Sequence, residues 1–321
     1  MIGDSCQIQE VIKLISKISS CDAQVLIEGE TGTGKEVVAR SIHYGGVRHN
    51  KPFIPVNCGA IPDNLFESQL FGHCKGAFTD AKIDHPGIVG LAGEGSIFLD
   101  EIDSLSAKGQ VTLLRFLQDN CYRKVGGNRE IQSNVRVISA SNTNLMNRVQ
   151  CGDFRMDLFY RLNVLHLTLP PLRERQGDIK LLAEHFIKHY SEKLGQPPKS
   201  FHPDTLAWFE KYGWPGNVRE LENLVYREFL MCEESIIMIK PLMTHLTERR
   251  RNPDRRRFSW ARKNFNEAKD FAIIDFEQRY LLCLLSESKG NITLAAKIAG
   301  KERRCLGKLI KKHHIDPNLF H

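Results

Sequence analysis

The residues with the clearest chemistry follow a short apolar run, Val25-Leu26-Ile27, and precede a helical pattern, Val37-Val38-Ala39. They are Gly29, Glu30, Thr31, Gly32, Thr33, Gly34, Lys35 and Glu36. Glycines allow backbone N–H groups to surround phosphate oxygens, and a lysine at the end of the run can reach the outer phosphates. The run therefore predicts a P-loop that binds a nucleoside triphosphate. The strict motif has Ser or Thr after the lysine to bind Mg²⁺, so Glu36 predicts that the ion depends on another carboxylate.

Two adjacent acids supply such a carboxylate. Asp100 and Glu101 follow the apolar run Ile97-Phe98-Leu99, about seventy residues after the P-loop. We expect Asp100 to hold Mg²⁺, directly or through water, and Glu101 to polarise the water that attacks the γ-phosphate. A protein that only binds ATP needs no positioned base, so the pair predicts hydrolysis.

Three further polar residues suit the same reaction. The apolar run Val135 to Ala140 leads to Asn142, whose amide could sense the γ-phosphate. Arg155 and Arg161 are permanently charged, planar donors of the kind that stabilise a phosphoryl group during transfer. For either arginine taken alone, a surface salt bridge is the simpler interpretation.

Composition places the chain among ordinary globular proteins. It has 321 residues, of which 41% are apolar and 26% charged, which excludes a disordered chain and predicts two or three domains. No apolar run approaches the roughly 20 residues that span a bilayer, and the N-terminus lacks a secretion signal. The nine cysteines are scattered without a C-x-x-C pair, which predicts free thiols in a reducing cytoplasm.

The positive charge is concentrated at the carboxyl end. From Arg249 onwards there are 18 Lys and Arg against 8 Asp and Glu, a net +10, whereas the preceding residues carry −3. A small basic segment predicts a nucleic-acid-binding unit, with a solvated charge run as the alternative. Residues 291–299, a turn at Gly300 and residues 303–313 predict a helix-turn-helix, with a generic helical hairpin as the alternative.

Each helix of this pair has an expected role. Ala295, Ala296 and Ile298 should allow close contact between the helices. The side chains expected to meet DNA phosphates and base edges are Arg303, Arg304, Lys308, Lys311 and Lys312.

Periodicity predicts the remaining architecture. Ile8, Val11, Ile12, Ile15 and Ile18 lie on one face of an amphipathic helix. Short β-branched runs separated by helical stretches predict parallel strands, hence an α/β domain, and residues 178–248 have mostly helical patterns. The arginine-rich stretch after residue 248 predicts a linker, because no core could absorb its charge.

Several motifs in register resemble the AAA+ domain of bacterial sigma-54-dependent transcription activators, over residues 2 to about 240. They are the P-loop run above, Gly76-Ala77-Phe78-Thr79-Asp80-Ala81, Phe98-Leu99-Asp100-Glu101, Phe154-Arg155 with Arg161-Leu162-Asn163-Val164, Leu169-Pro170-Pro171-Leu172-Arg173-Glu174-Arg175 and Trp214-Pro215-Gly216-Asn217-Val218-Arg219-Glu220-Leu221.

The resemblance implies an organisation in four parts. Residues 1–172 would form the AAA+ α/β nucleotide-binding subdomain, with a three-layer P-loop fold and a parallel sheet, and 173–247 the helical lid. Residues 248–268 would be the basic linker. Residues 269–321 resemble the all-α, Fis-type helix-turn-helix domain that ends these activators.

The resemblance also implies roles for site residues. Asn57 would restrain Glu101 until the target is engaged, and Asn142 and Arg219 would be the sensor I and sensor II residues. Arg155 and Arg161 would be arginine fingers that reach a neighbouring subunit, so the active state would be a homo-hexameric ring. Glu36 is the usual residue at its position in this family.

The loop from Gly76 to Ala81 resembles the segment that contacts sigma-54 and moves with the nucleotide state. Its members are Gly76, Ala77, Phe78, Thr79, Asp80 and Ala81, with Asp80 where the family has glycine. A second loop, residues 123–127, should turn at Gly126 and Gly127 and support the first. The expected partners are the sigma-54 RNA polymerase holoenzyme and enhancer-like DNA.

Three functions follow, in order of preference. The first is an ATP- and Mg²⁺-dependent activator that remodels the holoenzyme to open promoters. The second is a DNA-binding AAA+ regulator without productive sigma-54 contact, because of Asp80; the third is a metabolic kinase, disfavoured because the basic tail would have no purpose. The layout, without an N-terminal regulatory domain, is similar to the phage-shock operon activator and implies control by a separate regulatory protein, unless the chain is a fragment.

Overall fold

The computed structural model describes residues 1–79, 81–239, 291–301 and 303–313, and single positions between 277 and 288. Asp80 and the predicted linker at 248–268 lie outside the described residues. The chain divides into two compact units, Met1–Lys240 and Pro241–His321, and each is described by itself.

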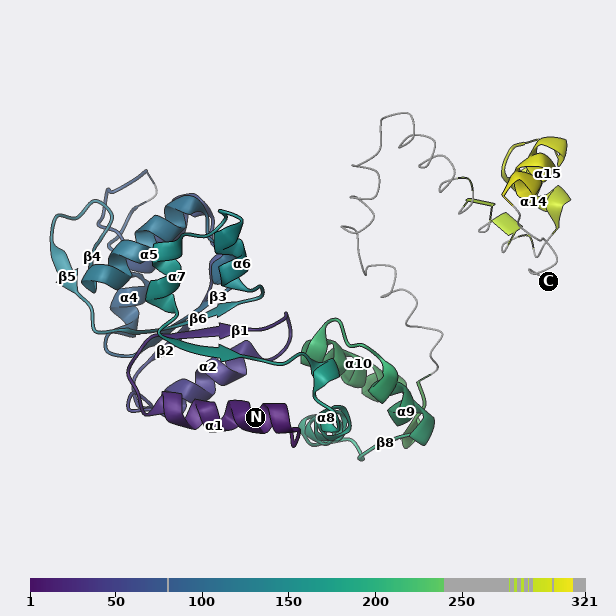
Figure 1. Ribbon diagram of the computed structural model, residues 1–321, viewed down its shortest axis with the longest axis horizontal. Coiled ribbons are helices and arrows are strands. Elements are labelled where there is room, and N and C mark those ends of the chain that lie inside the picture. The colour runs from purple at the N-terminus through teal and green to yellow at the C-terminus, as the bar shows by residue number, and fades with distance from the viewer. Residues whose placement is uncertain are drawn as a thin grey trace. The chain divides into compact units, whose positions relative to one another are not determined.

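The first unit is built on a parallel sheet of five strands in the order β2-β3-β6-β1-β7 (Figure 1). Their bounds are β1, Val25–Glu28; β2, Phe53–Asn57; β3, Ser96–Asp100; β6, Arg136–Ser141; and β7, Leu165–Thr168. Val25 of β1 lies beside Ile138 of β6 and Leu165 of β7. The three apolar runs predicted as strands are confirmed as β1, β3 and β6.

Helices cover both faces of this sheet, which gives three layers (Figure 1). Alternation along β1 sends Val25 and Ile27 to one face and Leu26 to the other. The first face packs against α1, Cys6–Ser19, and α2, Lys35–Tyr44. The opposite face packs against α3, Asp63–Phe71; α4, Gly87–Ala92; α5, Ala107–Asp119; α6, Leu145–Gln150; and α7, Met156–Leu162. None of the described helices is long and apolar enough to cross a membrane.

Two strands of this sheet were not predicted. β2 contains Pro55, which cannot donate a ladder hydrogen bond, so its sequence argues against a strand. The structure places β2 at the edge of the sheet, where only one side must pair, and Pro55 is tolerated there. β7 is the opposite edge strand, and its alternation of buried and exposed residues is short.

A small antiparallel hairpin stands apart from the sheet. It comprises β4, Cys121–Arg123, and β5, Glu130–Gln132, which confirms the turn predicted at Gly126 and Gly127. Gly126 has a φ of 76°, and a Cβ added there would lie 2.7 Å from the Cβ of Ala77. The hairpin therefore contacts the loop that begins at Gly76.

The lid follows a short 3-10 helix, Leu172–Glu174, and has its own core. Trp214, Phe209 and Phe229 are completely buried in it. The elements are α8, Asp178–Leu194; β8, Ser200–Phe201; α9, Pro203–Lys211; α10, Asn217–Met231; and β9, Ile236–Ile237. Two further 3-10 helices, Cys58–Ala60 and Ile102–Ser104, lie beside the carboxyl ends of β2 and β3.

A buried carboxylate ties the first residues of the chain to the lid. Asp178 accepts hydrogen bonds from the backbone N–H groups of Asp4 and Ser5 at 2.7 and 2.9 Å and from the Ser5 hydroxyl at 2.8 Å. Arg175 completes the set with an ion pair of 2.8 Å, in which both side chains are buried. Burial would raise the pKa of Asp178, but these donors outweigh it and hold the pKa below its ordinary value.

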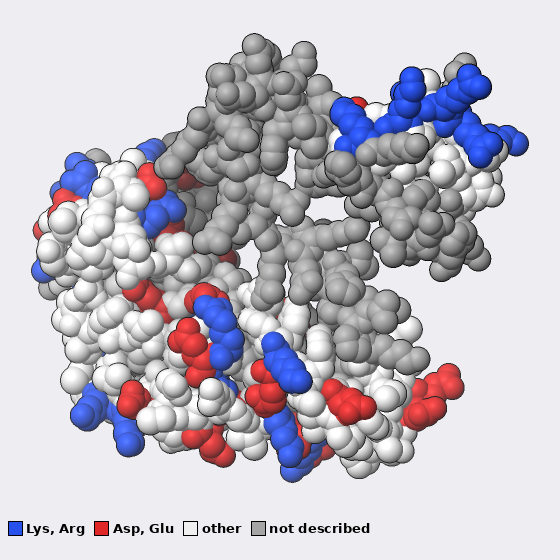
Figure 2. Space-filling model, turned by 45° about the vertical axis from the view of Figure 1, so that its right-hand side comes forward, with Lys and Arg blue, Asp and Glu red and all other residues white. Residues whose placement is uncertain are grey.

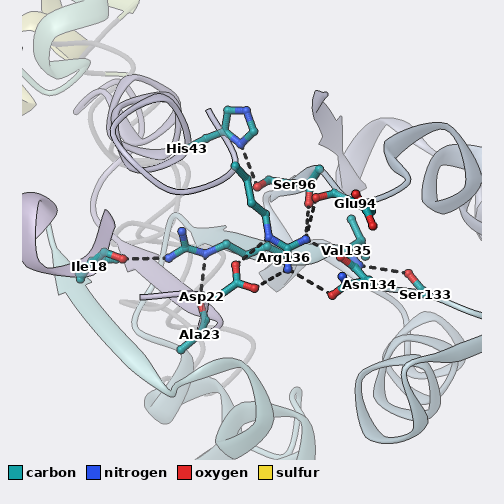
Figure 3. A network of polar contacts seen from close by, with 12 residues as sticks. Ile18, Asp22, Ala23, His43, Glu94, Ser96, Ser133, Asn134, Val135 and Arg136 are labelled. Atoms are coloured by element: carbon teal, nitrogen blue, oxygen red, sulfur yellow. Dashed lines mark hydrogen bonds and ion pairs between the residues drawn. The ribbon is translucent and has the colours of Figure 1, made fainter. Parts of the chain in front are cut away.

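A second buried network lies at the amino ends of the strands of the five-stranded sheet (Figure 3). Arg136, at the start of β6, donates to the carbonyl oxygens of Ala23 at 3.1 Å and Ile18 at 3.0 Å. His43 Nδ1 lies 2.9 Å from the Ser96 hydroxyl at the start of β3. Burial lowers the pKa values of both Arg136 and His43.

The second unit contains a pair of short helices, α14, Ile292–Ile298, and α15, Arg303–Lys312. Gly300 lies between them with a φ of 61°, as the predicted turn requires. Ala295 and Ala296 are buried, as expected, but Ile298 is 51% exposed. The expectation for Ile298 is wrong: the core between the helices contains Ala295 and Ala296 of α14 with Leu306 and Ile310 of α15, and Ile298 lies outside it.

Candidate nucleotide site

The predicted phosphate-binding residues meet at the carboxyl ends of the strands. The P-loop follows β1, Asp100 ends β3 and Asn142 follows β6, and the carboxyl ends of parallel strands lie together. A cavity of about 380 Å³ opens there. It is lined by Thr31, Gly32, Gly34, Lys35, Glu36, Val37, Asn57, Asp100, Glu101, Asn142, Val218, Arg219 and Glu222.

The P-loop places its lysine in the wall of this cavity. Gly32 and Gly34 have φ values of 80° and 100°, a backbone conformation that glycine adopts without strain. Lys35 Nζ donates to the carbonyl oxygen of Gly29 at 2.7 Å and to Asn142 Oδ1 at 2.7 Å. Burial lowers the pKa of Lys35, while the nearby Asp100 acts in the opposite direction. The site thus contains a desolvated cation next to an amide that the sequence predicted as a sensor.

Glu101 has the strained backbone that is typical of functional residues. Its φ is 54°, which is uncommon for any residue other than glycine. A Cβ added at Gly59 would lie 2.7 Å from Glu101 Oε2 and 3.3 Å from Asn57 Oδ1. Asn57 and Glu101 therefore approach the same glycine, and the absence of a side chain at Gly59 leaves room for both.

The cavity has acidic side chains from β3 and from α2. Burial raises the pKa of Asp100, against the opposing effect of a hydrogen bond from the Glu101 N–H at 2.9 Å. Glu36, also at the cavity, accepts from Arg40 at 2.7 and 2.9 Å. Carboxylate oxygens are the ligands that Mg²⁺ prefers, so Asp100 is the residue that would hold the ion, directly or through water.

Other P-loop side chains turn away from the cavity. The carboxylate of Glu30 accepts from Arg173 at 2.6 and 2.8 Å, and this ion pair holds the pKa of Glu30 below its ordinary value. Thr33 donates its hydroxyl to the carbonyl oxygen of Glu30 at 2.8 Å. For Gly29, Glu30 and Thr33, any contact with phosphate would therefore come from the backbone or from a change in side-chain position.

The lid closes one side of the cavity. The N–H groups of Val218 and Arg219 lie 3.0 and 3.3 Å from the carbonyl oxygen of Gly32. A Cβ added at Gly32 would be 2.3 Å from the carbonyl oxygen of Gly216, so the lid backbone touches the P-loop. Arg219 thereby reaches the pocket that contains Lys35, as its motif predicted.

Sequence reasoning missed several residues around the site. Gly59 and Glu222 contribute to its shape, and Asp103 accepts from the Asn142 N–H at 3.2 Å and the Thr143 hydroxyl at 3.3 Å. Asp103 follows the predicted acids by two residues, and this spacing was the available signal. Nothing in a single sequence indicated that Gly59 faces Glu101.

Two predicted catalytic residues lie apart from this pocket. Arg155 forms an exposed ion pair with Asp157 at 2.7 Å, and Arg161 donates to the carbonyl oxygens of Leu117 and Gln118 at 3.0 and 3.1 Å. Neither is among the residues that line the nucleotide cavity in the described part of the chain.

The loop at Gly76 folds back on itself. The Gly76 N–H donates to the carbonyl oxygen of Ala81 at 2.8 Å. The Ala81 N–H donates to the carbonyl oxygen of Phe78 at 3.0 Å. The ring of Phe78 packs edge-on against His73 at 4.9 Å and is 37% exposed, and Thr79 is exposed. The tip of the loop is thus accessible and has an aromatic side chain.

The three-layer α/β fold, the P-loop and the lid define a P-loop ATPase of the AAA+ type. Comparison with protein families matches the Sigma-54 interaction domain to residues 1–168 and the AAA+ ATPase lid domain to residues 173–257. The chain belongs to the sigma-54 interaction family. The resemblance and the AAA+ fold predicted from the motifs are confirmed.

Similar proteins match nearly all of this chain. Regulatory protein AtoC of Escherichia coli is 39% identical over 318 residues, which cover 99% of this chain and 68% of AtoC. Response regulator protein PilR of Pseudomonas aeruginosa is 40% identical, with 98% of this chain and 70% of PilR covered. For nitrogen fixation protein AnfA of Azotobacter vinelandii, at 39% identity, the chain spans only 58% of the relative.

A solved structure supports the architecture. NtrX from Brucella abortus, crystallised in complex with ATP, is similar with a TM-score of 0.73 and 30% identity. The match covers 98% of this chain and 69% of NtrX. NtrX was also crystallised in complex with ADP.

Proposed function

We propose that this chain is a sigma-54-dependent transcription activator that hydrolyses ATP in a homo-hexameric ring, binds enhancer-like DNA and remodels RNA polymerase holoenzyme. The observation that carries the proposal is one cavity that joins Lys35, Asp100, Glu101, Asn142 and Arg219. Family membership and the exposed Phe78 loop support the choice of target. A cytoplasmic location follows, because DNA and RNA polymerase are there.

In this proposal each group has a part in hydrolysis. P-loop N–H groups and Lys35 would bind the phosphates, and Asp100 would hold Mg²⁺, which neutralises phosphate charge when bound. Glu101 would orient a water and accept its proton as the oxygen bonds to the γ-phosphorus. The bond from that phosphorus to the bridging oxygen breaks, and ADP and phosphate leave.

The positions of the two arginines support an assembly. Arg155 and Arg161 lie on or beside α7, exposed and outside the pocket of their own chain. Arginines that act in trans reach a neighbour's γ-phosphate, and a closed ring supplies every pocket with one neighbour.

The proposal predicts a nucleotide-dependent complex with sigma-54. The full chain, trapped with ADP and a transition-state phosphate mimic, should comigrate with sigma-54 in native electrophoresis. Phe78→Ala should abolish the complex because the loop loses its exposed aromatic contact. Ile83→Ala is the matched control, since Ile83 is 72% exposed and lies two residues after the loop that ends at Ala81.

The alternative function gives a different pattern. If Asp80 prevents the contact, the unmodified chain will form no complex and Asp80→Gly will create one. No complex with either protein would contradict the proposed target.

Basic side chains support the DNA-binding part of the proposal. They follow one another across the face of the second unit seen in Figure 2. Arg303, Arg304 and Lys308 are exposed, and Lys312, although exposed, has an ion pair with Glu277 at 3.0 Å. The side chain of Lys311 lies outside the described residues.

DNA affinity should therefore fall steeply with salt. Each neutralised phosphate contributes about 0.9 to the slope of log affinity against log salt, so replacing Arg303 and Arg304 by alanine should reduce the slope by about 1.8. Fluorescence anisotropy with a labelled DNA duplex measures this slope. Lys180→Ala, on the lid, is the control, and an unchanged slope in the double variant would contradict the assignment.

A further inference from the structure

A single buried amide connects the lid to the P-loop. Asn217 is completely buried at the start of α10 and has a φ of 52°. Its Oδ1 accepts from the Leu172 N–H at 2.8 Å, and its Nδ2 donates to the Thr31 carbonyl oxygen at 3.0 Å and to Glu30 Oε2 at 3.2 Å. Both donors and the acceptor of the amide are therefore used, by partners from the hinge and from the P-loop.

An ion pair reinforces the same junction. Arg173, beside Leu172 at the hinge, binds both oxygens of the Glu30 carboxylate. The bidentate geometry fixes the orientation of Glu30, and hence the oxygen that Asn217 contacts. These three side chains, Glu30, Arg173 and Asn217, are called the lid latch below.

The latch determines where the lid arginine lies. Arg219 is two residues after Asn217, and its N–H meets the carbonyl oxygen of Gly32. The carbonyl oxygens of Thr31 and Gly32 accept hydrogen bonds from the lid. The same two residues line the nucleotide cavity. A shift of the P-loop would therefore move Arg219, and a shift of the lid would move the P-loop.

We infer that Asn217 is a positioning residue for nucleotide binding, which acts through Arg219 and is oriented by the Glu30–Arg173 ion pair. The inference rests on the proposed ATP hydrolysis. Arg219 carries the contact with nucleotide, and the lid latch holds Arg219 at the phosphates. Loss of the latch leaves Lys35, Asp100 and Glu101 in place, so it should weaken binding more than it slows the chemical step.

The first experiment separates positioning from folding. Asn217→Gly allows the same left-handed backbone and removes the side chain whose amide makes the three hydrogen bonds. In the full chain we expect KM for ATP to rise about tenfold while kcat falls by less than about threefold. Asn120→Gly is the matched control: Asn120 has a φ of 51° but lies at the end of α5, remote from the lid latch, and its KM should be unchanged.

A double-variant comparison tests the route through Arg219. If Asn217 acts by positioning Arg219, the KM of the Asn217→Gly and Arg219→Ala double variant should equal that of Arg219→Ala alone. Independent contributions would instead multiply the KM effects of the two single variants, which would overturn the inference. A merely structural role for Asn217 also predicts multiplication.

Further readouts distinguish the possible failures. If Asn217→Gly does not fold, as judged by its thermal unfolding midpoint, Glu30→Gln tests the same latch and should raise KM for ATP in the same direction. Affinity for a fluorescent ATP analogue, measured without hydrolysis, tests the latch even if the unmodified chain cleaves no ATP. An unmodified chain that cleaves no ATP would refute the proposed function. Normal hydrolysis by the unmodified chain, together with unaltered nucleotide affinity in Asn217→Gly and Glu30→Gln, would refute the latch.

Discussion

Arg161→Ala should lower the steady-state rate of ATP hydrolysis by a factor of about 10³ to 10⁵, the range measured for arginines that stabilise phosphoryl transfer. Affinity for ATP should change little, because Arg161 does not line the cavity of its own chain. A coupled assay for ADP release, with nucleotide affinity measured separately, checks both parts. Arg155→Ala should have an effect in the same direction.

The loss should be repairable in trans. In a mixture of Arg161→Ala and Lys35→Ala proteins, an intact pocket of the first can meet an intact arginine of the second, and hydrolysis should partly return. Arg227→Ala is the control, because Arg227 also forms an exposed local ion pair, with Glu228 at 2.8 Å. Two inactive proteins that stay inactive when mixed would contradict a shared site.

Glu101→Gln should lower the rate of hydrolysis by about 10² to 10⁴ while ATP still binds. Glutamine retains the size of the side chain but cannot accept the proton of the attacking water. The variant should therefore accumulate in the ATP-bound form, which rapid filtration with labelled ATP detects. Glu94→Gln, a change in an exposed acid that pairs with Lys51, should leave the rate unaltered.

A normal rate in Glu101→Gln would show that another group positions the water. Asp103, which contacts the Asn142 backbone at 3.2 Å, would then be the next residue to replace. The backbone strain at Glu101 would also need another explanation, since a φ of 54° costs free energy that function is expected to repay.

The nucleotide site could be predicted from sequence because its chemistry lies at strand ends. Lys35, Asp100 and Asn142 each follow a short apolar run, and parallel strands bring those ends together whatever the sequence between them. The positions of the P-loop glycines were also predictable, because the left-handed backbone at Gly32 and Gly34 is a local requirement that favours glycine. This explains why residues more than 100 positions apart, such as Lys35 and Asn142, were assigned to one pocket.

Other features depend on contacts that no local pattern encodes. The β2 strand was missed because Pro55 is acceptable only at an edge, and edge position is a property of the whole sheet. Ile298 was expected at the contact between the helices together with Ala295 and Ala296, yet a short helix buries one stripe only, and Ile298 lies outside that stripe. The bonds of Asn217 to residues 30 and 31 span more than 180 positions.

The buried guanidinium of Arg136 has a consequence for the stability of the sheet. It anchors the beginning of β6 to the backbone that precedes β1, and His43 ties the beginning of β3 to α2. The carboxyl ends of the same strands meet the P-loop, the start of α2, two short 3-10 helices and the lid. The strands are thus held together at their amino ends by contacts that take no part in the nucleotide cavity, so a substitution of Arg136 should disturb the folding of the sheet without touching the ATP site directly.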